Sequence, residues 1–358
     1  MNYPRKLQEL LESVIERKAS DLHIIANHCP VLRITRTLTD LEEAGRTSAV
    51  DSKGLAFALM SIEQQKEFLE HKEIDFAYDY EGKLRFRVNI FFQKGMVSAA
   101  LRAIPSKIRT IEELNLPPIL NKFVTAKQGL VLITGASSQG KSTTLAALID
   151  AINHQRREHI ITIEDPIEYI FDNDKCIIQQ REVLNDTLSF AAALRSALRE
   201  DPDVIMVGEM RDLETISTAL TAAETGHLVF ATVHTNSASQ TIHRTIDVFP
   251  PHQQDQISAQ LANSLLGVLS QRLLPKSKEG FVPACEVMIC NSAVKNLIRE
   301  NKTHEVPSII ETSSQEGMIS FNKNLADLVS SGVITRETAL EYCLNEQDLM
   351  ARLGEDRL

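Results

Sequence analysis

One stretch of this chain constrains its fold more than any other, because an apolar run, a glycine-containing loop and a helix-forming segment follow one another directly. The apolar run is 130–134, the loop reads Gly-Ala-Ser-Ser-Gln-Gly-Lys-Ser over 135–142, and helix-compatible residues continue to Ile152. Glycines let backbone N–H groups converge on an anion, and the amino end of a helix adds its dipole. This order of elements predicts a phosphate-binding loop in a parallel α/β sheet.

Spacing within the loop predicts what its residues bind. Lys141 is placed to reach the β- and γ-phosphates of a nucleotide, and the Ser142 hydroxyl is placed to ligate Mg²⁺. We therefore expect ATP and Mg²⁺ as ligands. The residues expected to hold them are Gly135, Ser137, Ser138, Gln139, Gly140, Lys141, Ser142 and Thr143.

Beyond this loop, predicted strands and predicted helices continue to alternate along the chain. Continuous apolar runs recur at 160–163, 204–207 and 228–233, with helix-compatible segments between them. Such runs suit strands that are buried on both faces of a parallel sheet. We therefore expect an α/β nucleotide-binding domain over 121–275. After Pro251 the pattern reads as helical to the end of the chain, which predicts a helical C-terminal region over 276–358.

The first hundred residues have a different pattern. Leucine spacing predicts an amphipathic helix over 5–18, and short β-prone runs with turns between them predict antiparallel hairpins over 76–103. This indicates a separate α+β domain over 1–103. The sequence Leu116-Pro117-Pro118 then breaks the chain, and we place an interdomain linker at 104–120.

Two acidic residues follow predicted strands of the α/β domain. Glu164 comes directly after 160–163, and Glu209 follows 204–207 by one glycine. Ligands of open parallel sheets bind at the carboxyl ends of the strands, so both carboxylates are expected near the phosphate loop. ATP hydrolysis needs one carboxylate to orient water and others to order the metal, and position alone leaves open which residue does which.

Histidine and arginine side chains are further candidates. His234 follows the strand 228–233 at its carboxyl end, where it could donate a hydrogen bond to a γ-phosphate or be merely structural. Arg85, Arg87 and Arg102 lie on the predicted hairpins of the first domain. They could belong to a solvated sheet face, or they could complete a nucleotide site from another domain or subunit. Residue pattern alone leaves both alternatives open.

Composition excludes several other classes. The formal charge is −10 and the longest basic run is a pair such as Arg156-Arg157, so no nucleic-acid partner is expected. No apolar run approaches the roughly 18 residues of a transmembrane helix, and the start lacks a secretory signal. The 5 cysteines form no CxxC pair, which argues against a zinc or redox site. We expect a cytoplasmic protein.

Together these motifs resemble one family, the PilT-type retraction ATPases of type IV pili, within the larger secretion ATPase superfamily. The segment 164–168, Glu-Asp-Pro-Ile-Glu, resembles its Asp box, and 197–211 resembles its Walker B region. The segment from Glu224 to Thr235 resembles its His box, and 85–91 resembles part of its N-terminal PAS-like domain. The resemblance covers nearly the whole chain.

The resemblance implies a PAS-like N-terminal domain followed by a RecA-like P-loop ATPase domain that forms a homohexamer. It implies that Glu164 is the catalytic glutamate, that Glu209 assists at the metal and that His234 takes part in the chemistry. It also implies that Arg85, Arg87 and Arg102 lie near the phosphates. The expected function is pilus retraction and twitching motility at the cytoplasmic side of the inner membrane, through a PilC-like platform protein, with a second retraction ATPase as a further partner.

Two features bear on the branch of this family. The segment 293–300 resembles the AIRNLIRE element associated with retraction, whereas the end of the chain from 314 to 349 looks more like the PilU branch of accessory retraction ATPases. The extra N-terminal region and tetracysteine motif usual in extension ATPases are not seen. We therefore expect retraction rather than extension, with the PilT or PilU branch open.

The phosphate loop departs from the family pattern GPTGSGKS, because Ser138 stands where the family has glycine. If this position needs a positive φ, a serine there costs on the order of 1 kcal/mol, which would slow hydrolysis without abolishing it. Two alternatives to a motor therefore remain: a nucleotide-binding accessory subunit with little turnover, and a nucleic-acid translocase, which the acidic charge disfavours.

Overall fold

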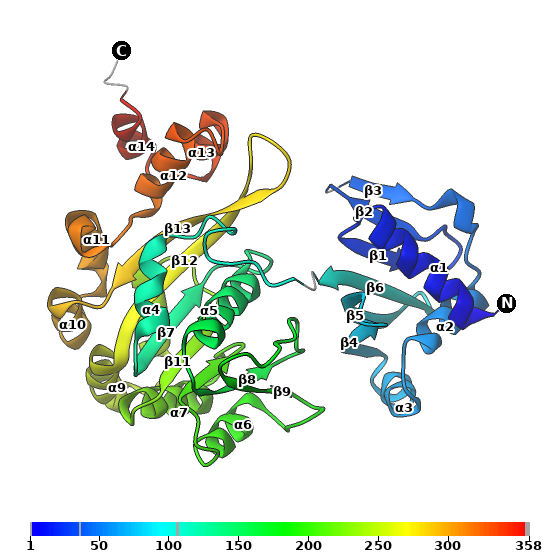
Figure 1. Cartoon of the computed structure of the whole chain (residues 1–358), viewed down its shortest axis with the longest axis horizontal. Coiled ribbons are helices and arrows are strands. Elements are labelled where there is room, and N and C mark those ends of the chain that lie inside the picture. Colours follow the sequence, from blue (N-terminus) through cyan, green and yellow to red (C-terminus); the bar gives the residue numbers. More distant parts are fainter. Residues whose placement is uncertain (1, 36, 105–106, 355–358) are drawn as a thin grey trace. The chain divides into compact units, whose positions relative to one another are not determined.

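The computed structural model describes residues 2–35, 37–104 and 107–354. Part of the predicted linker (105 and 106) and small parts of the predicted terminal domains (1, 36 and 355–358) therefore lie outside the described residues. The chain forms two compact units, which are described separately (Figure 1). The N-terminal unit comprises Met1–Lys107 and Pro166–Ile170, and the C-terminal unit comprises Ile108–Asp165 and Phe171–Leu358.

The N-terminal unit is built on a six-stranded antiparallel sheet in the order β3-β2-β1-β6-β5-β4. Its strands are β1 (Asp21–Ile24), β2 (Val31–Ile34), β3 (Thr37–Asp40), β4 (Glu73–Tyr80), β5 (Leu84–Gln93) and β6 (Met96–Ile104). Its helices are α1 (Tyr3–Glu16), α2 (Ala49–Ala58) and α3 (Ile62–His71), with a 3₁₀ segment η1 (Glu42–Ala44). The antiparallel hairpins and the first helix are thus found where the sequence predicted them.

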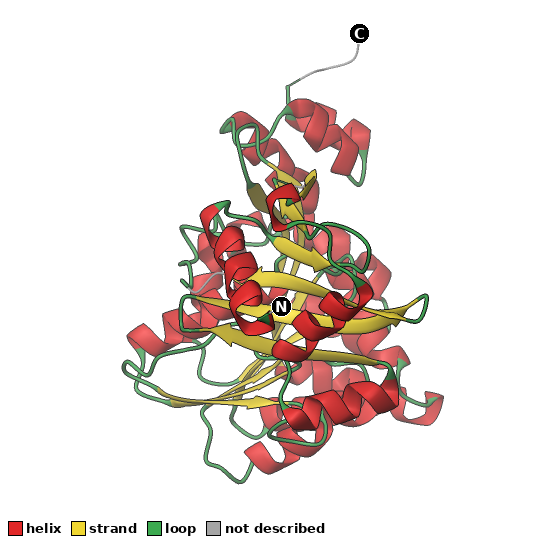
Figure 2. Cartoon of the chain, turned by 90° about the vertical axis from the view of Figure 1, so that its right-hand side faces the viewer, coloured by secondary structure: helices red, strands yellow, loops and turns green. Residues whose placement is uncertain are grey.

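One face of this sheet carries the core of the N-terminal unit. Helix α1 begins with Pro4 in its first turn and buries Leu7, Leu10, Leu11 and Val14, which lie on one side at helical spacing. These leucines pack with alternate strand residues such as Phe86 and Val88 on β5. Figure 2 shows α1, next to the label N, crossing the strands of this sheet.

The opposite face of the same sheet is charged. The cross-strand register places Arg33, Asp21, Arg102 and Arg87 in one row across β2, β1, β6 and β5. Asp21 is buried, and Arg102 Nε donates to its Oδ1 at 3.0 Å while Arg33 Nε lies 3.5 Å from its Oδ2. We call these four residues the charged row. Alternation along the strands thus separates an apolar face from a polar one.

The C-terminal unit contains a seven-stranded sheet in the order β13-β12-β7-β11-β10-β8-β9. Its strands are β7 (Gly129–Thr134), β8 (His159–Glu164), β9 (Ile177–Glu182), β10 (Val204–Val207), β11 (Leu228–Val233), β12 (Leu265–Pro275) and β13 (Phe281–Ile289). Strand β13 is antiparallel to β12, and the other pairings are parallel. The predicted α/β fold with a parallel sheet is confirmed, with one antiparallel strand at its edge.

Helices surround this sheet, and β7, β10 and β11 are buried along their whole length. The helices that accompany the sheet are α4 (Asn121–Thr125), α5 (Lys141–Gln155), α6 (Phe190–Ala197), α7 (Leu213–Glu224), α8 (Ala238–Asp247) and α9 (Pro251–Ser264). The C-terminal helices are α10 (Ser292–Arg299), α11 (Val306–Thr312), α12 (Phe321–Ser330), α13 (Arg336–Tyr342) and α14 (Glu346–Arg352). Short 3₁₀ segments are η2 (Pro118–Leu120), η3 (Thr303–Glu305) and η4 (Ser314–Glu316).

The expectation that the chain is helical from Pro251 onward is wrong. Helix α9 ends at Ser264, and the hairpin of β12 and β13 extends the sheet before the C-terminal helices begin. The predicted helical region 276–358 therefore contains a nine-residue strand, β13. Leucines at 265 and 266 continue the helical spacing of α9, and a short apolar run does not distinguish a buried strand from a helix.

Across the described residues, no helix has the length and apolar character needed to cross a bilayer.

Candidate active site

The loop between β7 and α5 has the backbone of a phosphate cradle. Gly135 and Gly140 have φ values of +150° and +82°, and Ser138 has a φ of +62°. Position 138 thus has the positive φ on which the conformational cost depends, and the serine carries that cost. Ser137, Ser138 and Ser142 are exposed to solvent on this loop, where a ligand can reach them.

Lys141, at the first position of α5, folds back over the loop that precedes it. Its Nζ donates to the carbonyl oxygen of Gly135 at 2.8 Å and to that of Ala136 at 3.0 Å. The same ammonium lies 3.4 Å from Nδ1 of His234. The loop carbonyls therefore hold the positive charge above the cradle, where an anion would meet it.

His234 follows β11 and links Lys141 to Glu209. Its Nε2 lies 2.8 Å from Glu209 Oε1, and Arg211 Nη2 lies 2.6 Å from Glu209 Oε2. The structure thus brings together three residues that the sequence had placed on separate elements, Lys141, Glu209 and His234. We call these three the edge network.

The protonation of His234 follows from its surroundings. Burial, and next the positive charge of Lys141, lower its pKa below the ordinary value, while Glu209 opposes this shift. A neutral ring with its proton on Nε2 can donate to Glu209 and accept from Lys141 at Nδ1, which satisfies both contacts. His234 is therefore assigned as neutral at pH 7.

Glu164 ends β8 and is 8% exposed. Its Oε1 accepts hydrogen bonds from Thr162 Oγ1 at 2.7 Å and from Gln180 Nε2 of β9 at 3.1 Å. The next strand, β10, is held alongside because the Gly208 N–H donates to the Ile163 carbonyl at 2.8 Å. Glu164 and Glu209 thus leave neighbouring strands at the same edge of the sheet.

The three arginines proposed to complete the site all belong to the N-terminal unit. Arg85 and Arg87 lie two residues apart on β5, so they share the charged face, and Arg102 lies opposite Arg87. Within this unit Arg85 Nε donates to the Ile167 carbonyl at 3.0 Å, and Arg87 Nη1 lies 4.0 Å from Glu168 Oε1. The segment Pro166–Ile170, which follows Glu164 and Asp165 in the chain, is therefore held against β5.

Further residues that the sequence pattern does not single out contact the site, among them Gln271 and Arg211. Gln271 on β12 donates from Nε2 to the Gln139 carbonyl at 2.7 Å, although β12 itself had been read as helix. Arg211 contacts Glu209 and had been noted simply as part of a motif. Three consecutive polar residues, Ser270-Gln271-Arg272, inside an otherwise apolar run were the signal available for Gln271.

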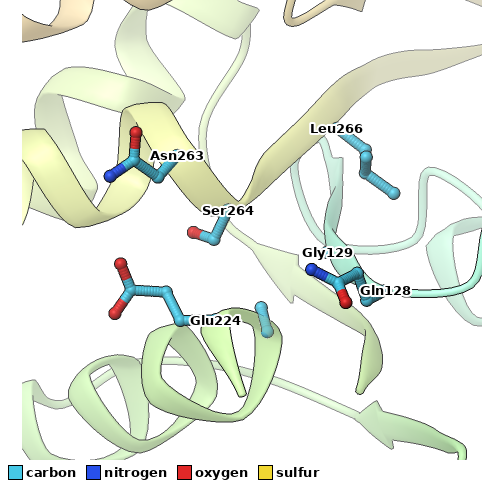
Figure 3. A pocket seen from close by; sticks show the side chains of 7 residues that line it. Gln128, Gly129, Glu224, Asn263, Ser264 and Leu266 are labelled. Atoms are coloured by element: carbon cyan, nitrogen blue, oxygen red, sulfur yellow. The ribbon is translucent and has the colours of Figure 1, made fainter. Parts of the chain in front are cut away.

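A separate cavity of about 340 Å³ lies at the amino end of β7 (Figure 3). It is lined by Gln128, Gly129, Ala223, Glu224, Asn263, Ser264 and Leu266. The phosphate loop begins at the other end of β7, roughly 20 Å away for a strand of this length. This cavity is therefore distinct from the phosphate cradle.

Comparison with known proteins places this geometry in a family. A family model for type II/IV secretion system proteins matches residues 2–308. The chain is 46% identical over 338 residues to the type IV pilus retraction ATPase PilT of Pseudomonas aeruginosa, covering 94% of this chain and 97% of that protein. It is 38% identical over 354 residues to the type IV pilus ATPase PilU of the same organism, covering 98% and 92%.

A solved structure agrees over almost the full length. The crystal structure of the pilus retraction motor PilT with bound ADP superposes with a TM-score of 0.88 at 47% identity, covering 96% of this chain and 98% of that one. The phosphate loop lies within residues 2–308, which the family model matches. The chain therefore belongs to the type II/IV secretion system protein family, and within it to the PilT-type P-loop ATPases.

Proposed function

We propose that this protein is an ATP-hydrolysing motor that retracts type IV pili and thereby drives twitching motility. The observation that carries the proposal is the edge network of Lys141, Glu209 and His234 beside a phosphate cradle, in a chain that matches retraction ATPases end to end. A relative from Neisseria gonorrhoeae, 45% identical over 303 residues and covering 84% of this chain and 81% of that protein, is named a twitching motility protein.

The substrate is ATP, bound with Mg²⁺. The cradle supplies backbone N–H groups and the Lys141 ammonium for the phosphates, and the exposed hydroxyl of Ser142 suits the oxygen-ligand preference of the ion. Glu209 would ligate the ion through Oε2, the oxygen that contacts Arg211. The Arg211 side chain is 78% exposed and can move aside. When bound, the ion neutralises charge on the β- and γ-phosphates.

Each candidate then has a chemical role. Glu164 orients and polarises the attacking water, because its carboxylate lies at the sheet edge and is held by Thr162 and Gln180. His234 contacts both Lys141 and Glu209, so it is positioned to respond when the γ-phosphate leaves. We assign phosphate-binding roles to Ser137, Ser138, Gln139 and Thr143 as part of the cradle.

Assembly completes the motor. We propose a homohexamer in which Arg85, Arg87 and Arg102 of the PAS-like domain approach the phosphates, with 104–120 as the linker. The partner is a PilC-like platform protein of the inner membrane, which places the ring at the cytoplasmic face, where a second retraction ATPase could join it. Support for this assembly is the family membership, together with the position of these arginines on the charged face of the N-terminal sheet.

One observation favours a second candidate, an accessory retraction subunit with low turnover. Ser138 adopts a left-handed conformation that serine disfavours, and the chain also matches PilU over 98% of its length. Such a subunit would bind ATP in the same cradle while turning it over slowly.

The test is ATP turnover by the purified protein of measured oligomeric state, together with restoration of twitching in a strain that lacks its retraction ATPase. The matched pair is Lys141→Ala and Lys127→Ala, since Lys127 is an exposed lysine that contacts Glu158. If the protein is a motor, the hexamer hydrolyses ATP and restores twitching. Lys141→Ala should abolish both activities, and Lys127→Ala should preserve both.

Three results would redirect the proposal. Turnover that survives Lys141→Ala would overturn the site assignment. A hexamer that binds ATP without hydrolysing it would establish the accessory role. Strong stimulation of hydrolysis by DNA would identify a translocase instead.

A further inference from the structure

Strand β12 runs alongside β7 and touches the phosphate loop at several points. The Leu273 N–H donates to Oε1 of Gln139 at 2.5 Å, and Gln271 Nε2 donates to the Gln139 carbonyl at 2.7 Å. Beside the loop, Ser270 Oγ lies 2.9 Å from Thr134 Oγ1 of β7. Two oxygens of Gln139, the side-chain Oε1 and the main-chain carbonyl, therefore accept hydrogen bonds from β12. The loop is thus tied to a strand that comes about 130 residues later in the chain, as the 132-residue separation of Gln139 and Gln271 shows.

Gln271 makes the central contact. Its side chain is 2% exposed, its Nε2 donates to the Gln139 carbonyl at 2.7 Å, and its Oε1 accepts from Thr144 Oγ1 of α5 at 2.9 Å. One amide therefore bridges the loop before Lys141 and the helix after it. A buried amide that satisfies two groups is costly to remove, because both partners lose their hydrogen bonds.

Backbone and side-chain atoms of Gln271 also lie close to the loop glycines. A Cβ atom at Gly135 would sit 2.5 Å from the Gln271 carbonyl oxygen, and one at Gly140 would sit 3.2 Å from Gln271 Nε2. The loop therefore has no room to shift toward β12, while hydrogen bonds from β12 prevent it from moving away.

We propose that Gln271 is a positioning residue for nucleotide binding. Gln271 on β12 and Gln139 on the phosphate loop together form what we call the clamp. The clamp holds the loop in its binding conformation, with Ser138 at positive φ, before the phosphates arrive. Because the ordering cost is met during folding, the clamp strengthens nucleotide binding. Gln139 occupies a position where the family pattern has serine, whose hydroxyl is too short to make the contact with Leu273.

The clamp predicts an effect on binding rather than on chemistry. Gln271→Met preserves volume but removes both hydrogen bonds, and we expect it to weaken binding of ADP with Mg²⁺ by about 10-fold. Gln139→Ser removes the contact with Leu273 alone, and we expect a loss of about 3-fold. The rate at saturating ATP should change by less than about 3-fold in Gln271→Met, since Glu164 is untouched.

Fluorescent ADP titration on the full-length protein measures the affinity without requiring turnover, so the outcome is independent of whether the protein is a motor or an accessory subunit. Gln271→Glu tests the conservative change, because it keeps an acceptor for Thr144 while losing the donor to Gln139. Its ADP affinity should remain below that of the wild type. Wild-type affinity in this variant would contradict the role of the amide donor.

Ser270→Ala is the matched control, since it removes a buried hydrogen bond from the same strand to β7 rather than to the loop. It should lower the melting temperature and leave ADP affinity within about 2-fold. If Gln271→Met is too unstable to purify, Gln139→Ser, which alters a half-buried loop residue, still decides the question. The proposal is overturned if folded Gln139→Ser or Gln271→Met binds ADP as tightly as the wild type.

Discussion

The two sheets of this protein place charged side chains in opposite ways. In the N-terminal unit, charged side chains from four neighbouring strands lie in one row across a face of the sheet, as the charged row shows. In the C-terminal unit, β7, β10 and β11 are buried on both faces, and Glu164, Glu209 and His234 appear where strands end. A sheet covered on both sides can present polar chemistry at its edge, whereas a half-covered sheet presents it across a face.

The difference also separates stability from function. The edge residues of the C-terminal unit contribute little to its core, so their loss should affect chemistry first. Residues within its strands should affect folding first. The charged row should affect folding less than the strand interior does, because Arg87 and Arg102 are 45% and 61% exposed.

The largest effect should come from Glu164→Gln at the sheet edge. We expect the turnover rate to fall by about 100- to 1,000-fold, because the amide cannot polarise water, while ADP affinity changes by less than about 3-fold. Glu182→Gln is the control, since Glu182 is the register partner of Glu164 on β9 and is also buried. Steady-state ATP hydrolysis measures the turnover rate of both variants. An equal loss of turnover in the two variants would mean that Glu164 supports the structure of the sheet edge rather than the chemistry.

A smaller effect should follow from truncating the strand interior. Ile161 is 0% exposed, and we expect Ile161→Ala to lower the free energy of unfolding of the C-terminal unit by about 2–5 kcal/mol. Asp21→Asn in the charged row should cost the N-terminal unit less, about 1–2 kcal/mol, because the amide oxygen still accepts from Arg102 although the charge is lost. Urea unfolding monitored by hydrogen exchange would resolve the two units. A larger loss from Asp21→Asn would break the contrast between the sheets.

The smallest effect concerns the protonation of His234. Its folded pKa lies below the ordinary value, chiefly through burial, so the unfolded chain binds the proton more readily. The stability of the C-terminal unit should therefore decrease as pH falls below about 6.5, the unperturbed value. Thermal melts of wild type and His234→Asn at pH 7.5 and 5.5 test this. The wild type should lose more than the variant, and a greater loss in the variant would reverse the assigned neutral state.

Much of the fold was predictable because local patterns and tertiary structure agree. Strands such as β10 and β11 are continuous apolar runs, and the phosphate-loop motif predicts both the strand before it, β7, and the helix after it, α5. The positive φ at Ser138 was also predictable, because the family places glycine there.

The rest depends on contacts distant in sequence. Strand β9, Ile-Ile-Gln-Gln-Arg-Glu, has too few apolar residues to stand out, and β12 follows α9 without a glycine or proline to mark the change. The bonds between Gln271, Gln139 and Thr144 join residues 132 and 127 positions apart, and no local pattern encodes them. The positions of Glu209 and His234 on one edge were predicted, whereas their direct contact needed the structure.

Strand β12 has one more consequence. Next to Gln271, Arg272 donates to the Tyr342 carbonyl at 3.3 Å, and its guanidinium lies 4.8 Å from the ring centre of Phe321 on α12. Neighbouring residues of a single strand therefore touch the phosphate loop and the C-terminal helices. Thermodynamic reciprocity then applies: a partner that binds those helices and displaces Arg272 would change nucleotide affinity, and nucleotide would change the partner's affinity by the same factor.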